Sequence, residues 1–140
     1  MFGRRHDPRI DALAGVPFFS GCGRQELETV AKVADEASFA SGEMLMREGE
    51  IGHEAFVLLR GDAVVTIGTV RVATLHPGDI VGEMALIEHE PRSATVVARD
   101  DVESLVLTNR GFNAVLDASP NVAWRVMTTL AQRLRKVQAA

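Results

Sequence analysis

The feature that most limits the fold of this chain is a run of short strand-like segments between residues 38 and 108. Apolar and β-branched residues gather in the segments 44–46, 56–59, 63–67, 70–73, 95–97 and 102–107. Turn residues separate these segments, as at Gly61-Asp62 and Pro77-Gly78-Asp79. Because the spacing leaves no room for the crossover helices of a parallel sheet, we expect a mainly β fold, a jelly-roll-like β-roll.

Helical periodicity flanks the strand region on both sides. Apolar residues recur at helical spacing in residues 24–33, and residues 9–13 form a shorter candidate helix before them. After the strands, Thr108 or Asn109 is a suitable N-cap for one helix, and Ser119-Pro120 begins a second. We therefore expect a single domain over residues 1–140, with a helical preface at 9–35, the roll at 36–108 and two C-terminal helices at 109–138.

Apolar residues in the last predicted helix follow a heptad spacing. The seam consists of Ala123, Met127, Leu130, Leu134 and Val137. Such a seam either joins two copies of the chain as a homodimer or packs the helix on its own roll. The sequence leaves both interpretations open.

The composition limits which kinds of partner the chain can bind and in which cellular compartment we expect it. The 140 residues are 46% hydrophobic and 24% charged with a net charge of -4, so no basic field is present to attract nucleic acid. No window approaches the roughly 20 apolar residues of a membrane-spanning helix. Cys22 is the only cysteine, which excludes an internal disulfide and a cysteine-based metal cage. We expect a cytoplasmic protein that binds neither nucleic acid nor membrane directly.

Enzyme signatures are absent from the sequence. The histidines at positions 6, 53, 76 and 89 are scattered, without the His-x-His pair of a metal-dependent β-barrel enzyme. There is no Gly-x-Ser-x-Gly elbow, and Cys22 has no histidine near it in sequence. We therefore expect neither enzymatic activity nor a metal.

Residues 82–95 interrupt the strand pattern with a single predicted helical turn, Met84 to Ile87, and return to a strand after Pro91. Arg92 in this position can hold an anion through two parallel hydrogen bonds, and Glu83 can accept one from a sugar hydroxyl. From the residue types alone, Glu83 and Arg92 favour a structural ion pair over a binding site.

This segment resembles the phosphate-binding cassette of the cyclic nucleotide-binding domain family. Gly82-Glu83, the small apolar run that follows and the ending Arg92-Ser93-Ala94 carry the resemblance. The nine-residue step from Glu83 to Arg92 is similar to the cassettes of protein kinase A regulatory subunits, and the Arg-Ser-Ala ending to that of the bacterial catabolite activator. Outside the cassette the resemblance includes Gly49-Glu50 and the segment 56–61, and it covers residues 13–137.

The resemblance implies a role for each cassette residue. Arg92 would neutralise the cyclic phosphate, and Ser93 and Ala94 would offer it further donors. Glu83 and the backbone of Gly82 would hold the ribose 2'-hydroxyl, with Met84 and Ala85 completing the ligand-binding turn. The expected ligand is cAMP, with cGMP as an alternative, and its binding would shift the C-terminal helices.

In this family, residues of the C-terminal helix usually cover the base of the nucleotide. The candidates here are Trp124, Arg133, Leu134 and Val137. Trp124 can stack on a purine, although a lone Trp more often belongs to a core.

The tip of the cassette departs from the kinase pattern. His89 stands where those cassettes have glycine, and Glu88 and Glu90 add negative charge close to an anion site. Two alternatives to a free-standing sensor therefore stay open. One is an interaction scaffold with a degraded pocket, and the other is the sensor fragment of a longer transcription regulator or enzyme.

Overall fold

The computed structural model describes residues 7–139, apart from the side chains of Arg133 and of residues 136–139. The strands form two antiparallel sheets. In spatial order, the first sheet contains β1 (Asp35–Phe39), β8 (Val102–Thr108), β3 (Glu54–Arg60) and β6 (Ile80–Val81). The second contains β2 (Met44–Met46), β7 (Thr95–Ala98), β4 (Ala63–Ile67) and β5 (Val70–Leu75).

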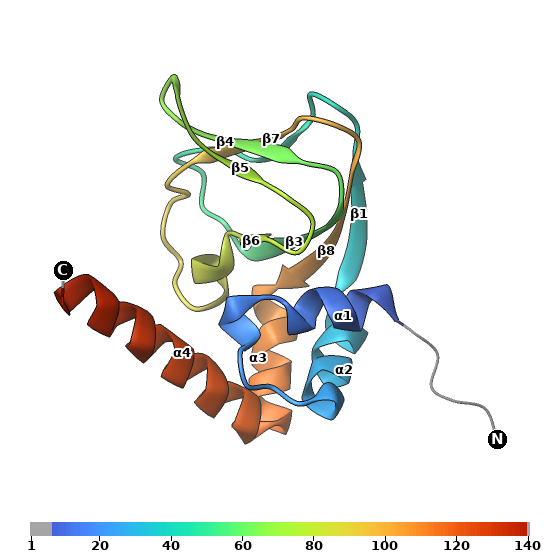
Figure 1. Ribbon diagram of the computed structural model, residues 1–140, viewed down its shortest axis with the longest axis vertical. Coiled ribbons are helices and arrows are strands. Elements are labelled where there is room, and N and C mark those ends of the chain that lie inside the picture. The colour runs from blue at the N-terminus through green and yellow to red at the C-terminus, as the bar shows by residue number, and fades with distance from the viewer. Residues whose placement is uncertain (1–6, 140) are drawn as a thin grey trace.

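The helices lie before, within and after the roll. They are α1 (Pro8–Ala14), the 3-10 turn η1 (Pro17–Phe19), α2 (Arg24–Val33), the 3-10 turn η2 (Glu83–Leu86), α3 (Asn109–Ala118) and α4 (Pro120–Ala139). Figure 1 shows the two sheets facing each other, with α1, α2 and α3 gathered under the sheet that contains β1, β8 and β3. The predicted jelly-roll-like β-roll with N-terminal helices and two C-terminal helices is confirmed.

The helix starts follow from local capping. The Asp7 carboxylate accepts a hydrogen bond from the backbone N–H of Arg9 at 2.9 Å, and Pro8 occupies the first turn of α1. The Thr108 hydroxyl accepts from the N–H of Gly111 at 3.0 Å and caps α3. Of the two predicted caps, Thr108 is therefore the one used.

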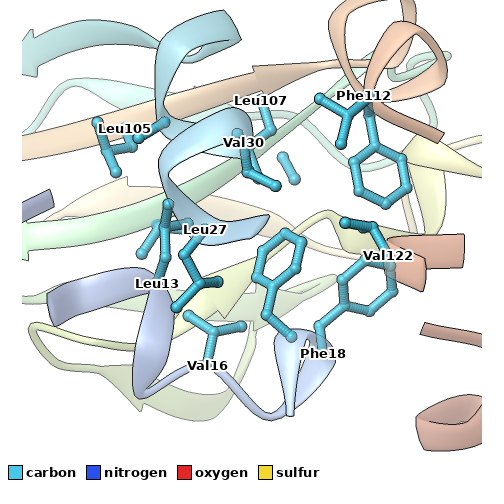
Figure 2. Packing of buried hydrophobic residues seen from close by; sticks show 14 of the residues in the cluster. Leu13, Val16, Phe18, Leu27, Val30, Leu105, Leu107, Phe112 and Val122 are labelled. Carbon is cyan, nitrogen blue, oxygen red and sulfur yellow. The ribbon is translucent and has the colours of Figure 1, made fainter. Parts of the chain in front are cut away.

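Strand β3 is buried on both faces and separates two apolar cores. Phe56 and Leu58 point into the roll, where they join a core made by both sheets. Ala55 and Val57 point the other way, because successive side chains of a strand alternate. On that side the helices contribute Phe18, Phe112 and Val122, which pack together with strand residues (Figure 2).

Two strands of the first sheet were not predicted from the sequence. β1 has no apolar alternation to mark it, since three of its five residues are exposed at the sheet edge. β6 is only two residues long and pairs with Phe56 and Val57 of β3. Pairing with a long buried strand gives each segment its β conformation.

Helix α4 divides its apolar residues between two environments. Val122, Val126 and Thr129 are buried where the helix contacts η1 and α3. In the predicted heptad seam, Leu130 packs partly on this core, whereas Met127 and Leu134 are exposed. Both alternatives for the seam therefore stay open: α4 packs on its own chain through contacts with η1 and α3, while Met127 and Leu134 face solvent. Val137 of the seam lies outside the described side chains.

Candidate functional site

The predicted cassette connects the first sheet to the second. It starts at Gly82, which follows β6 and has a φ of 80°. Glycine adopts this left-handed conformation without steric cost, so the chain turns directly into η2. The predicted helical turn at Met84 is thus present as a 3-10 turn that begins one residue earlier. The segment returns through Pro91, which forms an isolated β-bridge with Ile51, and enters β7 at Thr95.

The backbone of Arg92 is fixed to the loop between β2 and β3. Its N–H donates to the carbonyl of Glu50 at 2.8 Å, and its carbonyl accepts from the N–H of Gly49 at 2.9 Å. These two bonds place the arginine side chain over the start of β3.

The guanidinium of Arg92 is held by glycines and one carbonyl. Its Nη2 donates to the backbone carbonyl of Glu54 at 2.8 Å. A Cβ on Gly52 would overlap the guanidinium, and a Cβ on Gly82 would come within 2.5 Å of Nη1. The absence of side chains at these two positions therefore makes the space that the arginine occupies.

One guanidinium nitrogen of Arg92 is left unsatisfied. Nη1 is buried and has no hydrogen-bond partner among the described residues. Burial lowers the pKa of Arg92, and the nearby Glu54 carboxylate opposes that shift. A guanidinium nevertheless keeps its charge in proteins, so Arg92 remains a cation. A buried, charged donor without a partner is costly, which suits this nitrogen to an anionic acceptor.

A cavity of about 190 Å³ opens beside this nitrogen. It is lined by Met46, Gly82, Glu83, Met84, Ala85, Glu88, Glu90, Pro91, Arg92 and Ser93. Six of the seven predicted ligand-binding residues are thus brought together here. The seventh, Ala94, is only 7% exposed and belongs to the core inside the roll.

The two described side chains of the predicted base cap, Trp124 and Leu134, do not line this cavity. Trp124 is 64% exposed and Leu134 is 57% exposed. The side chains of Arg133 and Val137 lie outside the described part of the chain. Figure 1 shows the C-terminal half of α4 extending away from the helical layer.

Sequence reasoning missed several residues that shape the site. Met46 lines the cavity from β2, while Gly52 and Glu54 hold the guanidinium. Asn109 joins the cassette to α3, since its Nδ2 lies 3.4 Å from the carbonyl of Ala85 and 3.2 Å from that of Leu86. No local signal marks these residues, because each depends on strands and turns that are distant in sequence.

The described residues contain neither a candidate metal cluster nor a candidate membrane-spanning helix. No cluster of three or more His, Cys, Asp or Glu side chains suited to a metal ion occurs within residues 7–139. In the same range, no helix has the length and apolar run needed to cross a membrane.

Comparison with known proteins agrees with this geometry. Residues 36–119 match the family model described as cyclic nucleotide-binding domain. A cAMP-dependent protein kinase regulatory subunit from Hypocrea atroviridis is 32% identical over 104 residues, which cover 74% of this chain and 22% of that protein.

Solved structures show the same architecture. The N-terminal domain of a transcriptional regulator from Streptomyces coelicolor A3(2) superposes with a TM-score of 0.88 at 27% identity, covering 93% of this chain and 96% of that one. The catabolite activator protein of Thermus thermophilus gives a TM-score of 0.76 at 26% identity, covering 88% of this chain and 60% of that one. Matched regions span 11% to 60% of the curated relatives' own lengths.

Proposed function

Because this chain belongs to the cyclic nucleotide-binding domain family, we propose that it binds a cyclic nucleotide as a sensor, with cAMP preferred over cGMP. The observation that carries the proposal is the buried, unsatisfied Nη1 of Arg92 beside the cavity. A cyclic phosphate has a single negative charge and acceptor oxygens, which are what a partnerless guanidinium nitrogen requires. In this proposal no reaction is catalysed and no metal is needed.

Each cassette residue has a task in the proposed complex. Arg92 neutralises the phosphate, and Ser93 and Ala94 supply further donors to it. Glu83 accepts a hydrogen bond from the ribose 2'-hydroxyl beside the Gly82 backbone, while Met84 and Ala85 form the wall of the turn. The lining of the cavity by all of these except Ala94 supports the assignment.

The size of the cavity supports a separate cover for the base. Its volume of about 190 Å³ is below the roughly 300–1,000 Å³ of most small-molecule sites. Phosphate and ribose therefore fit inside, and the base stays at the mouth. We propose that α4 covers the base with Trp124, Arg133, Leu134 and Val137 after moving toward the cassette, since Trp124 and Leu134 are exposed and available for such a contact.

The binding test is isothermal titration calorimetry of the folded chain with cAMP and then with cGMP. Losing one partner of a buried charge pair costs about 2–5 kcal/mol, so Arg92→Ala should weaken binding about thirtyfold or more. Arg71→Ala is the matched control, because Arg71 is exposed on β5, where its Nη2 donates to the Thr74 hydroxyl on the same strand. Equal affinity in Arg92→Ala and wild type would remove Arg92 from the site.

A second candidate function is an interaction scaffold whose pocket has lost its ligand. Glu88 and Glu90 favour it, because both line the cavity and bring negative charge to it. The same titration separates the two. Absence of heat with either nucleotide, from folded protein free of co-purified ligand, supports the scaffold.

Transmission to the C-terminal helices is proposed to run through Asn109. Its backbone N–H donates to the carbonyl of His53 at 2.7 Å, and its amide contacts the end of η2. Leu86 of η2 is 1% exposed in the same core as Phe112 and Val122. A movement of the cassette on ligand binding therefore changes the contacts of both α3 and α4.

Hydrogen exchange with and without cAMP tests this route. We expect ligand to change amide protection from Asn109 onward, and the change to be smaller in Asn109→Ala than in the control Asn121→Ala on exposed α4 surface. Identical exchange in the bound and free protein would contradict a shift of these helices.

We further propose that the exposed face of α4 joins two copies of the chain as a homodimer.

A further inference from the structure

Two carboxylates line the cavity beside Arg92 without a role in the complex proposed above. Glu88 and Glu90 belong to the end of the cassette, and both residues are exposed. We propose that these two carboxylates make the site selective for phosphodiesters, which have a single negative charge, against phosphate monoesters, which have two. The inference rests on the proposed binding of a cyclic nucleotide.

The site can neutralise one negative charge. Nη2 of Arg92 already donates to the Glu54 carbonyl at 2.8 Å, whereas the buried Nη1 lacks a partner among the described residues. Of the described residues that line the cavity, Arg92 has the only cationic side chain. Ser93, also in the lining, offers a neutral hydroxyl. One charge on a phosphate therefore finds a counterion here, and a second charge does not.

Carboxylates dominate the charge around this cavity. Its lining contains one guanidinium and the three acidic residues Glu83, Glu88 and Glu90. Arg47 follows the lining residue Met46 in sequence, but its Nε is paired with the Glu50 carboxylate at 3.5 Å. The side chains of Glu88 and Glu90 form no hydrogen bond or ion pair with another described residue. Their charges are therefore left to act on a bound anion.

The charge of the ligand decides how strongly these carboxylates repel it. A cyclic phosphodiester has one negative charge at neutral pH. A phosphate monoester has a second pKa of about 6, so it has nearly two negative charges at about pH 7.5. Because the Coulomb energy is proportional to charge, each carboxylate repels the monoester about twice as strongly as the diester. Removing the carboxylates should therefore favour the monoester more.

The experiment compares three adenosine ligands by competition calorimetry with the full chain at about pH 7.5, where a monoester is mostly doubly charged. They are cAMP, AMP and adenosine 5'-(methyl phosphate), which is acyclic like AMP but singly charged like cAMP. The variant combines Glu88→Gln with Glu90→Gln. We expect its affinity for AMP to gain about three- to tenfold more than its affinities for the two singly charged ligands, as for two partly screened charges several ångströms from the phosphate.

Glu36→Gln combined with Glu103→Gln is the matched control. It removes two negative charges from exposed positions on β1 and β8 that do not line this cavity. Glu103 is in register with Arg60, at the opposite end of β3 from Glu54. The control should keep the wild-type preference for the methyl ester over AMP.

Ionic strength gives an independent measurement of the same repulsion. Salt screens exposed charges, so raising it from about 0.05 M to about 0.5 M should narrow the preference for the methyl ester over AMP in the wild type. The narrowing should be smaller in the variant that lacks both carboxylates, because less repulsion is left to screen.

Each outcome has a defined meaning. Equal gains for all three ligands in the Glu88 and Glu90 double variant, or no gain for AMP, overturn this inference and leave the binding of cAMP intact. Absence of cAMP binding to the wild type overturns the proposed function and this inference together. A larger gain for AMP than for both singly charged ligands, with circular dichroism showing an unchanged fold, supports the selective role of the two carboxylates.

Discussion

The position of the Arg92 guanidinium depends on a residue that has no side chain. Gly52 is buried, and its backbone φ lies outside the left-handed region, so its conformation is open to other residues. What excludes a side chain there is the guanidinium itself, which occupies the place of a Cβ. A single methyl group at this position therefore acts directly on the anion site.

We expect Gly52→Ala to weaken cAMP binding at least about tenfold, because the methyl displaces the guanidinium and breaks its bond to the Glu54 carbonyl. Calorimetric titration measures the effect, with circular dichroism to verify the fold. Gly15→Ala is the control, because Gly15 has a φ of -82° and its nearest neighbour to an added Cβ lies at 3.6 Å. If Gly52→Ala binds cAMP with the affinity of wild type, the position of the Arg92 guanidinium does not determine binding, and the prediction is wrong.

At the scale of one element, α1 depends on its cap. The helix has seven residues, too few to be stable in isolation. The Asp7 carboxylate satisfies the N–H of Arg9 and lies 3.5 Å from the Arg9 side chain. Ile10 and Leu13 then bury the inner face of the helix against the core.

Asp7→Ala should lower the free energy of unfolding by about 1 kcal/mol at neutral pH. The hydrogen bond from the Arg9 backbone lowers the pKa of Asp7 in the folded chain. The stabilisation is therefore present above the unfolded-state pKa of about 3.9 and is lost as the pH falls below it. Urea denaturation near neutral pH and at about pH 3 should show the gap between wild type and variant closing.

Asp117→Ala is the control for this experiment. Asp117 lies near the C-terminus of α3, where a carboxylate opposes the helix dipole, so its removal should not destabilise the chain. A gap between wild type and Asp7→Ala that stays constant with pH would contradict the capping role of the carboxylate.

At the scale of the whole molecule, α4 presents an apolar stripe away from the core. Trp124 is 64% exposed, Met127 is 55% exposed and Leu134 is 57% exposed. Their spacing along the helix places them on one side, next to Ala131. A contiguous apolar face of this kind is typical of an interaction surface. Trp124 and Leu134 also belong to the proposed base cap, so dimerisation and capping both use α4.

Sedimentation velocity over a range of concentrations tests the homodimer. Each buried side chain of this size contributes about 1.5–3 kcal/mol, so Met127→Lys combined with Leu134→Lys should weaken self-association at least about tenfold. Gln132→Lys is the control, since it adds the same charge at an exposed polar position of the same helix. A wild-type chain that is monomeric at all concentrations would contradict a dimer through this face.

Local patterns in the sequence were enough to predict most elements. Alternation and turn residues located β4, β5, β7 and β8, and the cap at Thr108 and Pro120 located the starts of α3 and α4. These signals are local because capping and turn formation involve residues only a few positions apart. They failed for β1 and β6, whose residues are strands because β8 and β3 pair with them.

The cassette was identified from the sequence because its residues are contiguous. Gly82, Glu83, Arg92 and Ser93 lie within one segment, and the structure brings all of them to one cavity. The heptad spacing in α4 was likewise visible, but which of its residues face solvent was not. That division followed from the contacts of α4 with η1 and α3.

The sequence by itself determined the β-roll, its flanking helices and the family to which the cassette belongs. Only the tertiary structure decided that Gly52 and Glu54 hold Arg92, that Asn109 reaches η2, and that His53 meets His89. These contacts join residues 23 to 40 positions apart in the chain, which come together through the pairing of β3 with β6 and β8. A periodic pattern in the sequence does not predict contacts between residues so far apart in the chain, because strand pairing and the packing of the two cores determine which residues meet.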